Sequence, residues 1–184
     1  MRILGLSGSL RRDSYNSALL RAAAELLPAG VELEIYDGVR ALPLYDADLD
    51  GDASPEPVVD LRETIADADA VLIATPEYNH SIPGVLKNAL DWASRPFPEN
   101  ALRGKPAAVV GASTGLFGAV WSQAETRKVL SAIGARVIDR ELPVCEAPEC
   151  FDADGRLANE GIAELLAELL TELCAETQEL APVH

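Results

Sequence analysis

Two stretches of the chain are apolar without interruption, and they constrain the fold more than any other feature of the sequence. Residues 70–75 run Ala-Val-Leu-Ile-Ala-Thr, and residues 107–112 run Ala-Ala-Val-Val-Gly-Ala. A strand with one solvated face alternates apolar and polar side chains, whereas a strand covered on both faces does not. The two stretches therefore predict central strands of a parallel sheet with helices on both faces.

The rest of the chain alternates strand and helix patterns around these two stretches. We predict further strands over residues 2–7, 31–36 and 136–142, the second of them an edge strand because acidic and apolar residues alternate in it. Helical patterns end near residues 27, 67, 92, 133 and 177. Such alternation is typical of an α/β three-layer sandwich, and a five-stranded parallel sheet fits the flavodoxin-like order 2-1-3-4-5. No repeat or linker interrupts it, so residues 1–184 are predicted to form a single domain.

The composition of the chain limits which partners it can bind and in which compartment we expect it. The chain has 30 Asp and Glu against 15 Lys and Arg, a net charge of −15, which argues against nucleic acid or an anionic membrane as partner. No apolar run approaches the roughly 20 residues of a membrane span, and no signal peptide is visible. Three cysteines and two histidines suit neither a disulfide framework nor a zinc site, so we expect reduced thiols and a cytoplasmic location.

One acidic segment has the beginnings of a metal site. Residues 46–51 resemble the start of a calcium loop. A complete loop carries glutamate at its twelfth place, which here is Pro57. We interpret the segment as a solvated acidic loop and predict no metal site.

The segment between the first strand and the first helix is a candidate anion site. Residues 8–16 run Gly-Ser-Leu-Arg-Arg-Asp-Ser-Tyr-Asn. Small residues let a backbone approach a ligand, the following helix points unpaired N–H groups at it, and Arg11 and Arg12 supply cationic forks. Serine and asparagine before a helix are also ordinary capping residues, so a purely structural interpretation remains open.

The loops after the first, third and fourth strands are neighbours if the strand order is right. Ligands of such sheets bind beyond the carboxyl ends of the strands, where the order reverses. The second of these loops offers Glu77, Tyr78 and Asn79, and the third offers Ser113 and Thr114 with two glycines. An anion site beside a polar and aromatic edge suits a mononucleotide such as FMN. The alternative is that Tyr78 packs locally and that Glu77 and Asn79 only serve the turn.

Two motifs resemble those of the NAD(P)H-dependent FMN reductase family. Residues 8–16 resemble its G-S-L-R-x-x-S-x-N loop, and residues 76–92 resemble its P-E-Y-N-x-S-x-P-G-x-L-K-N-A-x-D-W segment. Their order and spacing agree with the family, and the secondary-structure pattern agrees over almost the whole chain. The family includes FMN, quinone, azo-dye and chromate reductases, so the resemblance implies a flavoprotein oxidoreductase.

The resemblance implies an FMN-dependent enzyme with NADPH or NADH as electron donor. Hydride would pass to flavin N5 and then on to a small acceptor, a quinone, free flavin, azo compound or metal oxyanion, with ping-pong kinetics. No catalytic side chain is implied, because the flavin carries the chemistry. The resemblance also implies a homodimer or homotetramer with the flavin near the subunit boundary. Trp92, Phe97 and Trp121 are candidates for the interface or the core.

The resemblance further implies which residues bind the cofactor. The FMN phosphate and ribityl chain would be held by Ser9, Arg11, Ser14, Tyr15 and Asn16. The isoalloxazine would be lined by Pro76, Glu77, Tyr78 and Asn79, partly through backbone groups, with Ser113 and Gly115 approaching from the third loop. The chain departs from the family at residues 118–119, Gly-Ala, where family members often have two glycines.

Two other functions remain open at this point. A flavodoxin-like electron carrier without its own NAD(P)H turnover would suit the acidic charge, but residues 8–16 lack the T-x-T-G-x-T type of phosphate loop. A flavin-free scaffold or sensor on the same fold would be colourless. His80 is a candidate proton donor beside the flavin, and the alternative, which we favour, is a residue at the mouth of the site that faces solvent or a partner subunit.

Overall fold

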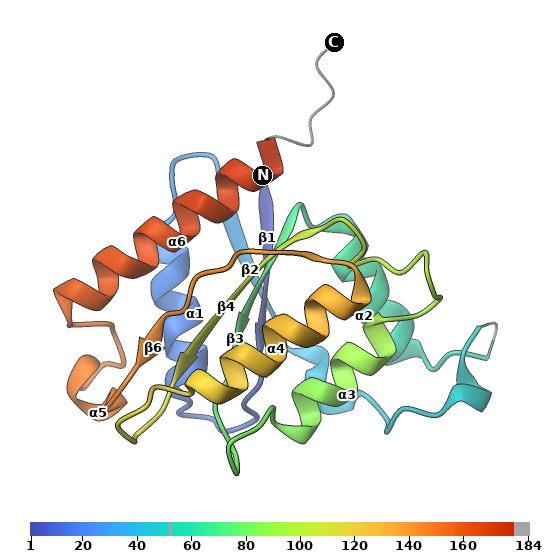
Figure 1. Cartoon of the computed structure of the whole chain (residues 1–184), viewed down its shortest axis with the longest axis horizontal. Helices are drawn as coiled ribbons and strands as arrows, with labels where there is room; N and C mark the ends of the chain where they lie inside the picture. Colours follow the sequence, from blue (N-terminus) through green and yellow to red (C-terminus); the bar gives the residue numbers. More distant parts are fainter. Residues whose placement is uncertain (52, 179–184) are drawn as a thin grey trace.

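The computed structural model describes residues 1–51 and 53–178, and a parallel sheet lies at its centre (Figure 1). The strands follow the order β2-β1-β3-β4-β5, which confirms the predicted flavodoxin-like order. All pairings along this path are parallel. The strands are β1 (Arg2–Ser7), β2 (Glu32–Tyr36), β3 (Ala70–Ala74), β4 (Pro106–Ala112) and β5 (Arg136–Val137).

Helices cover both faces of the sheet and complete three layers. One apolar cluster joins the sheet to α1 and α6, and a second joins the opposite face to α2, α3 and α4. The long helices are α1 (Tyr15–Leu26), α2 (Glu56–Asp67), α3 (Gly84–Ala93), α4 (Val120–Ile133) and α6 (Glu160–Gln178). The short ones are α5 (Ala147–Cys150) and the 3-10 turns η1 (Gly38–Ala41) and η2 (Ala47–Leu49).

The central strands are buried on both faces, as their unbroken apolar sequences predicted. Every residue of β3 and β4 is buried. Along β3, Leu72 packs in the cluster with α1 and α6, whereas Val71 and Ile73 pack in the cluster with α2, α3 and α4. The acidic residues of β2 are exposed, which agrees with its place at the edge of the sheet.

The prediction of one continuous strand over residues 136–142 is wrong. β5 ends at Val137, and a second short strand, β6 (Pro143–Val144), pairs with β4 further along. The buried side chain of Gln123 lies at this break, because its Oε1 accepts from the Leu142 N–H at 3.2 Å. Its Nε2 donates to the Leu142 carbonyl at 3.3 Å. The Leu142 carbonyl also accepts from the Gly111 N–H of β4 at 3.3 Å, so the side-chain amide bonds to both backbone groups of the residue that leads into β6.

The three large aromatic residues that sequence could not assign divide between core and surface. Trp92 is fully buried, and its indole N–H donates to the Pro43 carbonyl at 2.9 Å. Phe97 is 62% exposed and Trp121 is 40% exposed. Trp92 is therefore a core residue, whereas the other two lie on the surface of this chain.

The three cysteines lie in the carboxyl-terminal part of the chain and are all free thiols. Burial raises the pKa of Cys150 and of Cys174, which disfavours the reactive thiolate. Within residues 1–51 and 53–178, no helix combines the length and the apolar character needed to cross a bilayer.

Candidate functional site

A cavity of about 230 Å³ lies where the loops after β1, β3 and β4 meet. This is the carboxyl edge of the sheet, at the reversal of strand order between β1 and β3. Its wall contains all but two of the residues expected to bind the cofactor; Asn79 and Gly115 are each adjacent in the chain to a lining residue. The lining residues are Ser9, Arg11, Ser14, Tyr15, Asn16, Pro76, Glu77, Tyr78, Ala112, Ser113 and Thr114.

The start of α1 presents unpaired backbone donors to this cavity. Ser14 caps the helix, since its side chain accepts from the N–H groups of Asn16 at 3.2 Å and Ser17 at 3.4 Å. Within the part of the chain that the structure describes, the N–H groups of residues 13–15 have no acceptor. Arg11 lies beside them, with its guanidinium carbon 5.5 Å from the centre of the Tyr15 ring. This combination of free N–H groups, helix dipole and guanidinium fits a phosphate group.

Asn16 fastens this loop to the end of the neighbouring strand. Its Oδ1 accepts from the Ala112 N–H and its Nδ2 donates to the Ala112 carbonyl, both at 2.9 Å. The side chain is buried, and it satisfies the two backbone groups of the last residue of β4. Its packing role is one that we did not predict, because only the fold brings the start of α1 against the end of β4.

The loop after β3 is held by a tight turn at its tip. Tyr78 and Ser81 exchange backbone hydrogen bonds, with N–H to carbonyl distances of 3.3 and 3.2 Å. Asn79 and His80 between them have φ values of 55° and 60°, the left-handed pair that a type I′ turn requires. Asn79 therefore shapes the turn, while Tyr78, 54% exposed, stands at the mouth of the cavity.

Glu77 joins the loop after β3 to the start of α4. Its Oε2 accepts from the backbone N–H groups of Trp121 at 3.1 Å and Ser122 at 3.2 Å. Its Oε1 lies 3.3 Å from Nδ1 of His80. Since the N-cap residue Ala119 offers no side-chain acceptor, the carboxylate of Glu77 caps this helix from another loop.

The loop after β4 keeps the backbone conformation that two glycines would adopt. Gly118 has φ of 54°, and a Cβ on it would come within 2.6 Å of Pro143. Ala119 follows with φ of 61° and is buried. The departure from the family pattern at this position therefore leaves the left-handed turn in place, although alanine adopts it less readily than glycine.

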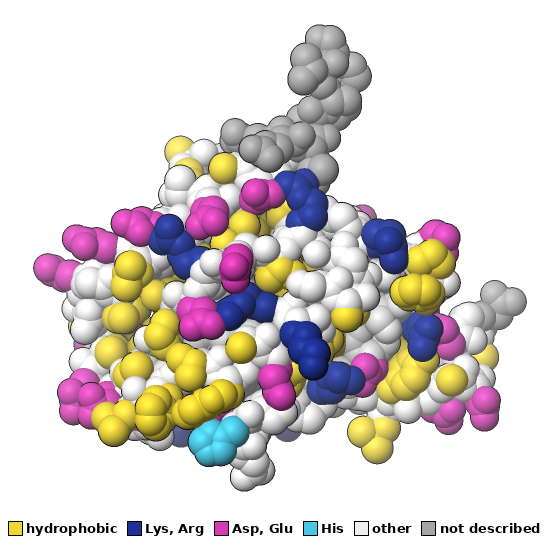
Figure 2. Space-filling view, in the orientation of Figure 1, with side chains coloured by type: hydrophobic (Ala, Val, Ile, Leu, Met, Phe, Trp, Pro, Cys, Tyr) yellow, Lys and Arg dark blue, Asp and Glu magenta, His cyan; other side chains and the backbone are white. Residues whose placement is uncertain are grey.

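His80 lies outside the wall of the cavity, on an aromatic surface next to it. Its side chain is 74% exposed and its ring stands edge-on to Trp121, with 4.6 Å between ring centres. The ring of Phe117 also lies against Trp121, with 5.0 Å between ring centres. In Figure 2, hydrophobic side chains gather beside the histidine at this edge of the molecule. This position of His80 is consistent with a residue at the mouth of the site.

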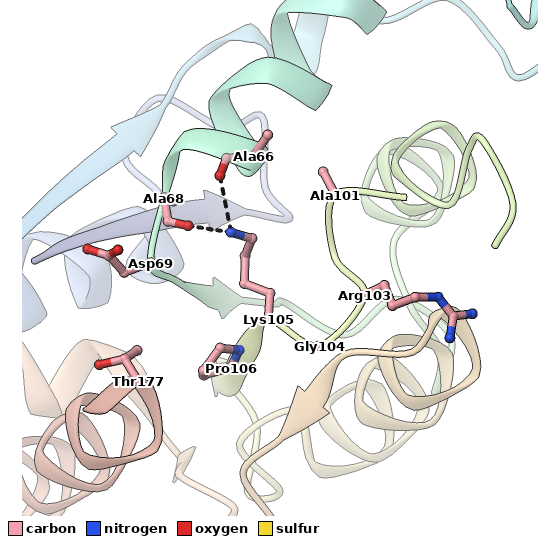
Figure 3. Close-up of a pocket in the computed structure, with 9 residues that line it drawn as sticks. All are labelled: Ala66, Ala68, Asp69, Ala101, Arg103, Gly104, Lys105, Pro106 and Thr177. Carbon is pink, nitrogen blue, oxygen red and sulfur yellow. Dashed lines mark hydrogen bonds between the residues drawn. The ribbon is translucent and has the colours of Figure 1, made fainter. Parts of the chain in front are cut away.

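A larger hollow, of about 510 Å³, lies at the opposite edge of the sheet (Figure 3). Lys105 occupies it and donates from Nζ to the carbonyls of Ala66 and Ala68, at the end of α2. Burial lowers the pKa of Lys105. Figure 3 shows Arg103 directed away from this lysine. Lys105 thus bonds to the carbonyl groups at the end of α2, and we place no ligand in this hollow.

Comparison with known proteins gives a consistent result. Residues 1–149 match the family model described as NADPH-dependent FMN reductase. The chain is 45% identical to an NAD(P)H-dependent FMN reductase of Pseudomonas aeruginosa, over 94% of this chain and 93% of that protein. It is 39% identical to a 2-hydroxy-1,4-benzoquinone reductase of a Burkholderia species, over 95% of each.

A solved structure supports the same relation. The flavoenzyme NAD(P)H:(acceptor) oxidoreductase FerB of Paracoccus denitrificans superposes with a TM-score of 0.85 and 36% sequence identity, and the match covers 97% of each chain. Sequence and backbone therefore agree over nearly the full length of both proteins. The chain belongs to the NADPH-dependent FMN reductase family of oxidoreductase enzymes.

Proposed function

We propose that this protein is an FMN-dependent NAD(P)H oxidoreductase that reduces a small acceptor, with quinones as the main class. The observation that carries the proposal is the cavity at the switch point of the sheet, where free N–H groups of residues 13–15 and Arg11 adjoin a polar and aromatic wall. The curated relatives named for FMN and for a benzoquinone support the choice of cofactor and acceptor.

The residues of the cavity divide into two groups by chemistry. Ser9, Arg11, Ser14, Tyr15 and Asn16 would hold the phosphate and ribityl end of FMN, with the start of α1 supplying the N–H donors. The flat ring would lie against Pro76, Glu77, Tyr78 and Ser113, with Gly115 approaching from the loop after β4, while Asn79 shapes the turn after β3. FMN supplies the hydride-accepting and electron-donating centre when it is bound.

The protein's own contribution is to hold the ring and leave one approach open. Glu77 and Asn16 fix the three loops to one another through hydrogen bonds to α4 and β4. Because NAD(P)H and the acceptor would both approach the one open face of the ring, they use it in turn, which gives ping-pong kinetics. A set of parallel lines in double-reciprocal plots is the expected result, and intersecting lines would contradict this order.

We also propose that the protein is a homodimer or homotetramer in the cytoplasm. Leu116, Phe117 and Trp121 are 69%, 59% and 40% exposed, and they adjoin the mouth of the cavity. We call these three residues, with His80, the aromatic surface. Apolar side chains grouped in this way are typical of an interface, which would place the partner subunit beside the site. Free thiols support a reducing compartment.

The test of the proposed function is reconstitution with FMN, followed by desalting and absorbance spectroscopy. We expect a retained flavin band that bleaches when NADPH is added without oxygen, and reoxidation by a benzoquinone. A retained band that neither NADPH nor NADH bleaches would favour the electron carrier. No retained flavin, together with no FMN turnover, would favour a flavin-free protein.

Arg11 provides the residue-level test of the phosphate site. Replacing Arg11 with alanine removes a charge-assisted contact, so FMN affinity is expected to fall by about 1.5–3 kcal/mol, roughly 10- to 150-fold. The matched control is Arg103→Ala, because Arg103 lines the hollow at the opposite edge of the sheet and does not line the FMN cavity. Equal FMN affinity for the Arg11 variant and the control would contradict the assignment.

A further inference from the structure

A second cavity, of about 380 Å³, adjoins the proposed FMN cavity. Arg11, Ser14 and Tyr15 line both, so the two share one wall at the start of α1. The second cavity continues along α1 to Arg21, and its other side is the segment that follows α5 (Figure 1). A ligand placed in the first cavity could therefore reach the second without crossing the body of the protein.

Three arginines line this second cavity in a chain whose net charge is −15. They are Arg11, Arg12 and Arg21, and the chain has 15 Lys and Arg in all. Within residues 1–51 and 53–178, neither Arg12 nor Arg21 takes part in an ion pair, although acidic residues outnumber basic ones twofold. The Nη2 atom of Arg21 lies against the turn at Gly155, where an added Cβ would be 3.9 Å away.

The acidic groups of the same cavity leave these guanidinium groups available. Asp13, Asp152 and Asp154 also line it. The carboxylate of Asp152 is engaged in its own turn, since Oδ1 accepts from the N–H groups of Asp154 at 2.9 Å and Arg156 at 2.8 Å. Neither Asp13 nor Asp154 lies within ion-pair distance of an arginine in the described chain. Unpaired planar guanidinium groups are suited to a phosphate.

An aromatic pair stands in the same wall. The rings of Tyr15 and Phe151 have centres 5.5 Å apart and are tilted by 36°. Both residues line the cavity, which brings an apolar surface next to the arginines. A flat base beside a phosphate is the chemistry that this combination fits.

We propose that this second cavity binds the adenosine 2′-phosphate end of NADPH and makes the enzyme prefer NADPH to NADH. The proposal rests on the proposed function, because it assumes that the nicotinamide end of the same molecule reaches the FMN cavity. Arg12 and Arg21 bind the 2′-phosphate, and the Tyr15–Phe151 pair contacts the adenine. NADH lacks the only group that these two arginines recognise.

The direct test is nucleotide binding, measured by calorimetry on the protein as purified, with and without added FMN. Adenosine 2′,5′-bisphosphate is expected to bind at least 10-fold more tightly than adenosine 5′-monophosphate. Arg21→Ala and Arg12→Ala should each reduce this ratio, and the double variant should bring it below 3-fold. Arg21→Lys should keep part of it. Equal affinity of the two nucleotides for the unaltered protein would overturn the proposal.

Arg156→Ala is the matched control, because Arg156 belongs to the same turn region, is exposed and does not line the cavity. It should leave the ratio unchanged; an equal loss in this variant would mean a general charge effect and would overturn the site. In turnover, Arg21→Ala should lower kcat/KM for NADPH about 10-fold and leave FMN affinity and kcat/KM for NADH within 2-fold.

The two proposals fail in different ways. Failure of the unaltered protein to bind FMN would overturn the proposed function, while the bisphosphate ratio would still decide the second cavity. Normal FMN binding and NADPH oxidation with no preference between the two nucleotides would overturn only the second cavity. Inorganic phosphate that displaces the bisphosphate at equal concentration would show a general anion site and would also overturn the adenosine assignment.

Discussion

Glu77 shows how one side chain can hold two loops of the site together. From the sequence, Glu77 could either line the cofactor site or only stabilise its own turn. The structure places its carboxylate on the backbone N–H groups that begin α4, with His80 on its other oxygen. A carboxylate at a helix start is favourable both as hydrogen-bond acceptor and through the helix dipole.

Glu77→Ala should lower the free energy of unfolding by about 1–2 kcal/mol, because the first N–H groups of α4 lose their cap. Glu77→Gln keeps an acceptor and should lose less. Urea denaturation measures both, with Glu25→Ala as control, since Glu25 is exposed on α1. A loss below about 0.5 kcal/mol in the alanine variant would show that water replaces the cap without cost.

At the scale of elements, the loop between β4 and α4 depends on a close approach to Pro143, the first residue of β6. Gly118→Ala combines a positive φ with a Cβ 2.6 Å from Pro143, so backbone must move. We expect a loss of at least about 2 kcal/mol in unfolding free energy, together with weaker FMN binding. Thermal and urea unfolding measure the first, and flavin titration measures the second.

Gly84→Ala is the contrasting substitution, because Gly84 begins α3 with open space around it and no positive φ. Alanine there should be neutral or stabilise by up to about 1 kcal/mol, since it reduces the freedom of the unfolded chain. Equal effects of the two substitutions would contradict the close packing at Gly118.

The contact between β2 and α2 makes the stability of the fold depend on alkaline pH. Tyr36 is buried and donates its hydroxyl to Oδ2 of Asp60 at 2.8 Å. Burial, and then the hydrogen bond and charge of Asp60, raise the pKa of Tyr36 above its ordinary value of 10.0. The folded state therefore holds this proton at a pH where the unfolded chain has released it.

The stabilisation from Tyr36 is complete below pH about 10 and is lost as pH rises beyond it, because the unfolded state then binds fewer protons. The free energy of unfolding should fall more steeply between pH about 10 and 11 in the unaltered protein than in Tyr36→Phe. Urea denaturation at several pH values compares the slopes. Parallel curves for the two proteins would contradict the shift.

At the scale of the whole molecule, we propose that the aromatic surface is where copies of the chain associate. Trp121→Glu should convert the proposed dimer or tetramer to a smaller species, because a charge in an apolar interface has no partner. Light scattering after size-exclusion chromatography measures the mass. Phe97→Glu, an equally drastic change at a residue 62% exposed elsewhere, is the control and should leave the mass unchanged.

Either a monomeric unaltered protein or an unchanged mass for Trp121→Glu would contradict this interface. The second outcome would leave the aromatic surface free beside the cavity mouth. Its rings would then be available to an apolar acceptor.

Sequence alone determined the three-layer fold, the strand order, the edge position of β2 and the loops that gather at the switch point. The layers and the edge strand follow from local patterns, because burial of a strand and the start of a helix depend on neighbouring side chains in the chain. The strand order and the meeting of the loops follow from the few topologies that alternating strands and helices allow. The resemblance in residues 8–16 and 76–92 added the family, which the comparisons confirm.

Only the tertiary structure decided which distant groups meet. It divided the predicted fifth strand, where Gln123 of α4 bonds to Leu142. It also brought Asn16 to Ala112 and Glu77 to the start of α4. Arg21 and Phe151 came to line one cavity. Each of these arrangements joins segments that are separated in the sequence. Which of these groups meet depends on how closely the helices and strands pack. A local pattern of residues does not predict that distance.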